Sequence, residues 1–140
     1  MKKAKVAIIG GSGTEKLFPN LKPQTVKTPY GMAKPIFVGK VEGGNLVFLP
    51  RHGANHSLPP HKINYRANIY ALHKLGAKTV LATNAVGAIN ERIMPGDVVV
   101  PHDFVDFTKL RVSTFYDKAP VTHVDVSQPY CPDVRKLLIE

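Results

Sequence analysis

The chain has 140 residues, enough for one domain with a hydrophobic core and too few for two. Its hydrophobic fraction of 44% and charged fraction of 21% are typical of a globular protein, and no apolar run is long enough to span a membrane. The net charge of +9 comes from Lys and Arg residues scattered along the chain, without the aromatic–basic pattern of nucleic-acid-binding domains. We therefore expect small anionic ligands as partners, and neither a nucleic acid nor a membrane.

The cellular compartment is indicated by the cysteine count and by the N-terminus. Cys131 is the only cysteine, which excludes an internal disulfide and a cysteine-based metal cluster. The basic N-terminus is followed by an apolar run over residues 6–9 only, which is too short for a signal peptide. We expect a cytoplasmic protein.

The hydrophobic pattern predicts an α/β domain. Apolar and β-branched runs predict strands over residues 5–9, 24–28, 35–41, 45–49 and 78–83, and 97–101 and 104–107 are further extended runs. Glycines at 43 and 44 predict a hairpin. Residues 64–75 have apolar positions at helical spacing, with Asn64 as N-cap and Gly76 as C-terminal stop. Hairpin strands followed by a strand–helix–strand unit predict a mixed β-sheet.

The last ten residues predict a short helix. Pro132 lies in its first turn, Asp133 suits its positive end, and apolar residues at 134, 137 and 138 form one face. The chain ends at Glu140, after about two turns. Because nothing follows to cover that face, we expect that a longer protein is represented here by its first part.

The stretch VAIIGGSG, residues 6–13, indicates close approach of the backbone to a ligand. A dinucleotide site requires a third glycine, where Lys16 stands, and an acidic residue about 20 positions on, and both are missing. The Gly-Lys-Ser/Thr of a P-loop is absent too. A tight turn would explain the glycines, but the hydroxyl of Ser12 beside backbone N–H groups suits a small oxyanion.

Two later loops carry residues that suit the same anion. Arg51 and His52 follow the strand predicted over 45–49, and arginine grips two oxygens of a phosphate at once. Asn84 follows the strand predicted over 78–83 and is succeeded by small residues. Ligand sites in α/β sheets lie outside the carboxyl ends of strands, so these loops are expected to converge, although an isolated arginine is usually a surface residue.

Three histidines in the loop after the fourth predicted strand do not predict a metal site. His52 and His56 are four residues apart, a spacing that faces one metal only on a helix, and Gly53 with the prolines at 59 and 60 disfavours a helix. No carboxylate or cysteine lies near them or near His61. We expect no metal.

Several motifs in one order resemble the N-terminal half of the 5′-methylthioadenosine phosphorylases, which belong with the methylthioinosine phosphorylases to the trimeric purine nucleoside phosphorylase family. The motifs are IIGGSG (8–13), TPYG (28–31), PRHG (50–53), PPHKINYRANIYAL (59–72), TNAVGA (83–88), PGD (95–97) and TFYD (114–117). The resemblance implies that residues 1–140 are the N-terminal part of a single phosphorylase domain, with a mixed sheet flanked by helices. It also implies a homotrimer active in purine salvage, and phosphorolysis of a methylthiopurine nucleoside to free purine and 5-methylthioribose 1-phosphate. Inorganic phosphate is then a co-substrate, and no metal or organic cofactor is expected.

The resemblance also assigns roles to residues of this chain. Phosphate ligands are implied at Ser12, where the family more often has threonine, and at Arg51, His52, Asn84 and Ala85. The ribose and purine are lined by Val86 and Gly87, His56 neighbours the sugar, and His123 closes the 5′-methylthio pocket of the adjacent subunit.

The family's base-recognition residues lie in its C-terminal half, beyond this sequence. We therefore expect the 140-residue chain to be inactive alone, and the choice between 6-amino and 6-oxo purines stays open. The alternatives are phosphorolysis of methylthioinosine, inosine or guanosine, and, in another class, a truncated phosphate-binding module without catalysis.

Overall fold

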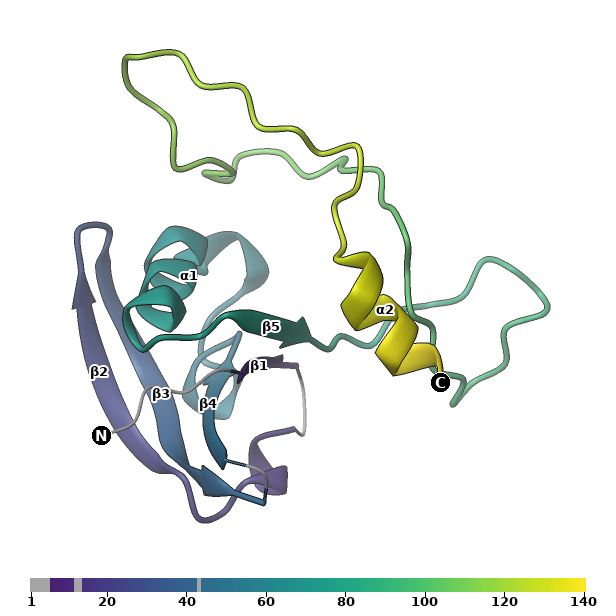
Figure 1. The fold of residues 1–140 in the computed structure, drawn as a ribbon, viewed down its shortest axis with the longest axis horizontal. Coiled ribbons are helices and arrows are strands. Elements are labelled where there is room, and N and C mark those ends of the chain that lie inside the picture. The colour runs from purple at the N-terminus through teal and green to yellow at the C-terminus, as the bar shows by residue number, and fades with distance from the viewer. Residues whose placement is uncertain (1–5, 12–13, 43) are drawn as a thin grey trace. The chain divides into compact units, whose positions relative to one another are not determined.

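The computed structural model describes residues 6–11, 14–42 and 44–140. The chain divides into two compact units, residues 1–85 and 86–140, and each is described by itself. The first contains a five-stranded sheet, and the second consists of a long irregular segment and one helix (Figure 1).

The first unit is built on a mixed sheet in the order β2-β3-β4-β1-β5 (Figure 1). β3 is antiparallel to β2 and β4, whereas β1 is parallel to both of its neighbours, β4 and β5. The mixed sheet predicted from the sequence is therefore confirmed. The strands are β1 (Val6–Gly10), β2 (Lys22–Thr28), β3 (Gly31–Val41), β4 (Gly44–Pro50) and β5 (Thr79–Ala82).

All five strands of the first unit overlap the runs predicted for them, and β3 differs most in its bounds. It begins at Gly31, four residues before the predicted start, because its pairing with β2 continues to the turn, where Thr28 is opposite Gly31. Pro35 breaks the sequence pattern of a strand, since proline cannot donate to the ladder, and the register between β2 and β3 shifts near it, between Gln24 and Val26. β2 and β3 are paired on either side of this irregularity.

Hydrophobic residues are buried on both faces of β4. Val47 and Leu49 face a cluster shared with β1, β2, β3 and helix α1 (Tyr65–Lys74). Leu46 and Phe48 face a second, smaller cluster that includes Leu21 and is packed against Phe18 and Phe37. β4 is therefore the centre of the fold, and its carboxyl end is held by packing from both sides.

Helix α1 begins where the sequence predicts it. The Asn64 side chain is the N-cap, and its Oδ1 accepts a hydrogen bond from Ala67 N at 3.0 Å. Its Nδ2 donates to Tyr30 O at 2.7 Å, which joins the start of the helix to the β2–β3 turn. At the other end Gly76 has a φ of +92°, a conformation that favours glycine after a helix. The predicted cap and stop are both confirmed.

We predict that Asn64→Ala lowers the free energy of unfolding of the first unit by about 1–2 kcal/mol, since it removes the cap and the bond to Tyr30. Asn64→Ser keeps an oxygen that can cap Ala67 N and removes the donor to Tyr30 O, so its loss should be smaller. Urea denaturation followed by circular dichroism measures both. An alanine variant within about 0.5 kcal/mol of the wild type would show that the cap is not needed.

The second unit contains helix α2 (Pro132–Ile139), close to the predicted position, and residues 86–131 form no helix or strand. The extended runs expected over 97–101 and 104–107 form no strand either, which corrects that expectation. A strand needs a hydrogen-bonded neighbour, and none pairs with these segments in the described part of this unit. Val98 and Phe107 are correspondingly 91% and 86% exposed.

The Arg135 side chain links helix α2 to the irregular segment. Arg135 Nε donates to Pro101 O at 2.8 Å, and its Nη2 donates to Val100 O at 3.5 Å. The apolar side of α2 stays open, with Leu137 73% exposed. None of the helices in the described ranges has the length and apolar character needed to cross a bilayer.

Candidate functional site

The carboxyl ends of three parallel strands lie side by side in the first unit. In the sheet register Gly10 of β1 is opposite Pro50 of β4, and Ile9 of β1 is opposite Ala82 of β5. The alignment continues past the strands, because Arg51 N donates to Gly10 O and Thr83 N donates to Ile9 O, each at 3.0 Å. The three loops that were predicted to converge therefore start from one edge of the sheet.

The side chain of Arg51 crosses this edge. It is partly buried, and its Nη1 donates to Thr83 O at 3.0 Å. A methyl group on Gly11 would lie 3.1 Å from Arg51 Nη2, 3.2 Å from Thr83 O and 3.7 Å from Asn84 Cα. The guanidinium of the β4 loop thus lies against both the glycine loop after β1 and the loop after β5.

The glycine loop itself is held at Gly11. Thr14 Oγ1 donates to Gly11 O at 2.8 Å, at the start of a 3-10 helix over Thr14–Leu17. Ser12, the proposed hydroxyl ligand, lies outside the described residues. Gly11, the last described residue before the gap, lies beside the Arg51 guanidinium. An oxyanion bound at this point would contact a positive charge.

His52 is fixed by the loop that follows β4. Its Nδ1 is 3.0 Å from Leu58 O, and Leu58 N donates to His52 O at 2.9 Å. The ring of His56 is stacked on it, with centroids 5.4 Å apart and an interplanar angle of 15°. The structure therefore brings together Arg51, His52 and His56 on one loop, with Arg51 reaching the loop after β5.

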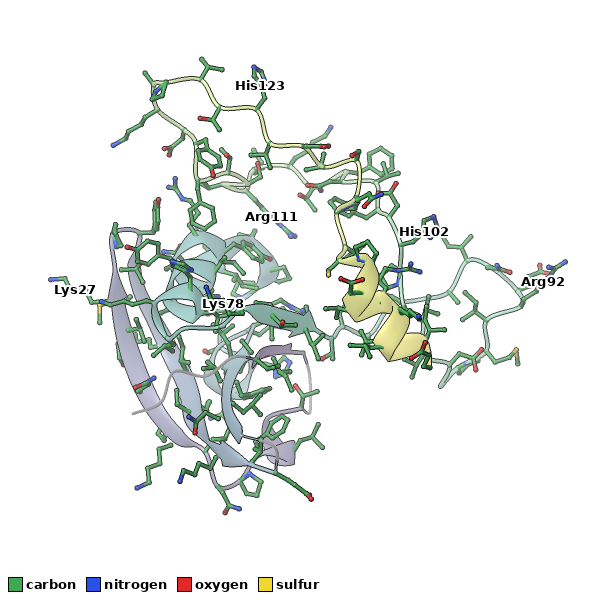
Figure 2. All side chains as sticks on the ribbon, in the orientation of Figure 1. Lys27, Lys78, Arg92, His102, Arg111 and His123 are labelled. Atoms are coloured by element: carbon green, nitrogen blue, oxygen red, sulfur yellow. The ribbon has the colours of Figure 1, made fainter. Side chains whose placement is uncertain are left out.

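The remaining predicted residues fall into two groups. Asn84 and Ala85 are exposed and directly follow Thr83, so they belong to the same edge as Arg51. Val86, Gly87 and His123 belong to the second unit, where a methyl group on Gly87 would have no neighbour within 4 Å. His123 lies on the long irregular loop of that unit (Figure 2).

Two backbone carbonyls orient site side chains and were not among the predicted site residues. Thr83 O holds the guanidinium of Arg51, and Leu58 O holds the imidazole of His52. Every residue has such a carbonyl, so no residue type marks it in a sequence. Gly11 is the residue type in the sequence that points to this arrangement. Because it has no side chain, the Arg51 guanidinium can lie close to its backbone.

Charge is distributed unequally between the two units. Residues 1–85 contain 13 of the 19 Lys and Arg residues and only two of the 10 acidic residues. Lys27 and Lys78, labelled in Figure 2, are two of its exposed cations. This excess raises the local concentration of small anions near the first unit. In the described ranges no group of three His, Cys, Asp or Glu residues is placed to hold a metal ion.

Two carboxylates of the second unit have shifted pKa values. Hydrogen bonds from the Thr108 side chain and backbone lower the pKa of Asp106, and those from the Ser127 backbone and side chain lower the pKa of Asp125. Both carboxylates accept from a backbone N–H two residues on, at 2.8 Å, as in Asx turns. These shifts therefore reflect local turns in exposed segments.

We predict that Gly11→Ala weakens anion binding through Arg51. The added methyl would lie 3.1 Å from the guanidinium and 3.2 Å from the Thr83 carbonyl oxygen, so one of them must shift by a few tenths of an ångström. This shift weakens their hydrogen bond, and such a bond contributes about 0.5–1.5 kcal/mol to stability. Calorimetric titration with inorganic phosphate measures the affinity of Gly11→Ala, Arg51→Ala and the double variant. If the methyl acts through Arg51, it has no further effect once Arg51 is removed, whereas additive losses would contradict this mechanism.

The sheet and its loops define an α/β protein with a cationic edge suited to an anion. The chain belongs to the phosphorylase superfamily, whose family model matches residues 5–140. It is 49% identical over 137 residues to S-methyl-5′-thioadenosine phosphorylase of Pyrococcus horikoshii, covering 97% of this chain and 53% of that protein. It is 50% identical over 144 residues to a probable 6-oxopurine nucleoside phosphorylase of Thermococcus kodakarensis, covering 96% and 54%.

A solved structure gives the same picture of the fold. Methylthioadenosine phosphorylase from Schistosoma mansoni in complex with adenine superposes with a TM-score of 0.89 at 43% identity, over 98% of this chain and 52% of that one. The phosphorylase-like fold expected from the resemblance is therefore confirmed. This chain spans about half the length of the relatives that it matches.

Proposed function

We propose that the edge formed after β1, β4 and β5 binds inorganic phosphate. The observation that carries this proposal is the position of Arg51, whose guanidinium lies against Gly11 and donates to Thr83 O. Arginine holds two phosphate oxygens in a planar fork, and backbone N–H groups near glycine supply further donors. The ligands are Ser12, Arg51, His52, Asn84 and the backbone of Ala85.

We further propose that the whole protein uses this phosphate to split a 5′-methylthiopurine nucleoside, most simply methylthioadenosine. Phosphate attacks C1′ of the ribose as the purine leaves, and the products are free purine and 5-methylthioribose 1-phosphate. The transition state carries positive charge at C1′, so an anion held beside it is stabilising. Phosphate is already anionic and needs positioning, which Arg51 and the neighbouring N–H groups provide. No metal or organic cofactor takes part.

A 6-oxopurine substrate, such as methylthioinosine, inosine or guanosine, is the second candidate. Support for it comes from the relative in Thermococcus kodakarensis, which is a probable 6-oxopurine nucleoside phosphorylase of comparable identity. Val86 and Gly87 line the ribose and purine in either case, and His56 neighbours the sugar. None of these side chains distinguishes an amino from an oxo group at C6.

The proposed assembly is a homotrimer in the cytoplasm, with a role in purine salvage. His123 of one subunit then closes the 5′-methylthio pocket of the next, so each site depends on an adjacent chain. Its exposed position on an irregular loop is compatible with contact to another subunit. Sedimentation of the active protein should give three times the subunit mass.

The activity is tested by joining this chain to the part of the Pyrococcus horikoshii relative that follows the matched region. The chimera and the 140-residue chain are each assayed with methylthioadenosine, methylthioinosine and inosine, with and without phosphate. We expect phosphate-dependent purine release by the chimera, and phosphate binding without turnover by the chain alone. Turnover by the 140-residue chain would contradict the proposed division of the site, and a well-folded chimera without activity would contradict the proposed reaction.

A further inference from the structure

The two histidines of the loop after β4 form one unit. The His52 ring is bounded by the Leu58 carbonyl at Nδ1, 3.0 Å away, and by the stacked His56 ring. The backbone closes the same loop, because Leu58 N donates to His52 O and Gly53 N donates to Pro50 O. The orientation of the His52 imidazole is thus determined from its edge and from its face.

The contact with Leu58 determines which nitrogen of His52 carries a proton. A backbone carbonyl oxygen only accepts hydrogen bonds, so Nδ1 must be the donor. In the neutral ring the other nitrogen, Nε2, then has a lone pair and accepts. A ligand that meets the neutral His52 ring at Nε2 must therefore bring its own proton.

The position of the His56 ring depends on an unusual backbone. Asn55 and His56 are consecutive non-glycine residues with φ values of +53° and +56°. L-residues rarely adopt this left-handed conformation, and such residues cluster at functional sites. Gly53, with a φ of +74°, precedes them, and a methyl group there would lie 2.9 Å from Ser57 Oγ. The loop therefore adopts an uncommon backbone conformation that brings His56 onto His52.

We propose that His56 is a positioning residue for His52: its stacked ring and the Leu58 carbonyl hold His52 as the Nδ1–H tautomer, with Nε2 accepting the proton of hydrogen phosphate. This inference rests on the proposed phosphate site and adds a basis for its specificity. Arg51 attracts any oxyanion, whereas an accepting Nε2 favours an anion that retains an O–H group. Sulfate carries no proton at neutral pH, so its oxygens face the lone pair without a hydrogen bond.

The tautomer is tested without any ligand. Nitrogen-15 NMR of the imidazoles in the 140-residue chain, at about pH 8 where histidine is ordinarily neutral, distinguishes a protonated from a bare ring nitrogen. We expect His52 to be protonated at Nδ1 and bare at Nε2. A His52 ring protonated at Nε2, or divided evenly between the two tautomers, would overturn the proposal.

The role of His56 is tested with two substitutions. His56→Asn removes the ring, and asparagine tolerates the left-handed conformation, so the loop can keep its path. His56→Phe restores a flat ring that can stack. Aromatic stacking is worth about 0.5–1.5 kcal/mol, so His56→Asn should raise the Kd for phosphate by about two- to tenfold, and His56→Phe should recover most of this loss. Equal loss in both variants, or none in His56→Asn, would contradict positioning by the ring.

Specificity provides the third measurement. Calorimetric titration at the same pH compares phosphate with sulfate on the wild type and on His56→Asn. We expect the wild type to prefer phosphate, and the preference to decrease in His56→Asn as His52 samples its other tautomer. Equal affinity of the wild type for the two anions would overturn the accepting role of Nε2. Absence of binding by either anion, with the Nδ1–H tautomer intact, would instead refute the proposed phosphate site and leave the positioning of His52 supported.

Discussion

Arg51→Ala is expected to lower the affinity of the chain for inorganic phosphate by about 10- to 150-fold, the equivalent of about 1.5–3 kcal/mol for hydrogen bonds to a charged group. The Arg51 side chain joins the β4 loop to the β5 loop, because its Nη1 donates to Thr83 O at 3.0 Å. Its removal deletes the charge and also releases Thr83 O from its partner. Isothermal titration calorimetry with phosphate measures the loss.

Two further variants separate the guanidinium from charge in general. Lys78→Gln removes one positive charge from an exposed position just before β5, at the opposite end of that strand from the proposed site (Figure 2). Its affinity for phosphate should stay within about twofold of the wild type, because salt screens exposed charges beyond about 10 Å. Arg51→Lys keeps the charge without the planar fork and should be intermediate. Equal losses in Lys78→Gln and Arg51→Ala would mean that phosphate responds to net charge alone.

Phe48→Ala is expected to destabilise the first unit by about 3–5 kcal/mol, the usual cost of removing a buried phenyl ring. Phe48 is 1% exposed and lies on β4, the strand that is buried on both faces. Its ring centroid is 5.3 Å from that of Phe18 and 6.2 Å from that of Phe37. Native domains are stable by only about 5–15 kcal/mol, so this loss is a large fraction of the total stability. Urea denaturation followed by circular dichroism gives the change.

Ile69→Ala is the matched control for that substitution. Ile69 lies on α1 and is 40% exposed, so truncating it leaves no closed cavity and should cost well under half as much. Phe48→Leu should lie between the two, since it refills part of the space. A Phe48→Ala variant as stable as Ile69→Ala would show that the smaller cluster on β4 does not stabilise the unit.

The first unit was predictable from sequence because its signals are local. Asn64 and Gly76 mark the ends of α1 by backbone chemistry that involves only neighbouring residues. The alternation of β4, with Val47 and Leu49 on one face and Phe48 on the other, follows from the two-residue period of a strand. Parallel strands bring their carboxyl ends to one edge, and this alone placed Arg51 near the loop after β5.

What could not be predicted depends on groups that no residue type reveals. The side chain of Arg51 is held by the Thr83 carbonyl, and that of His52 by the Leu58 carbonyl. The backbone at Asn55 and His56 is left-handed although neither residue is a glycine, the residue type that usually predicts this conformation. The expectation for residues 97–101 and 104–107 was wrong for a different reason. Their residues have high strand propensity, but strand formation requires a pairing partner, and propensity alone does not supply one.

Chemical-shift mapping during a phosphate titration tests the phosphate site most directly. Nitrogen-15-labelled chain is titrated with sodium phosphate at constant ionic strength, with sodium chloride as the reference. The proposed phosphate site predicts that the backbone amides of Gly11, Arg51 and Asn84 shift together along one saturable curve, since the three loops share one ligand. It would be contradicted if these amides stayed unchanged while phosphate was added, or if the saturable shifts fell only on the lysine-bearing strands β2 and β3.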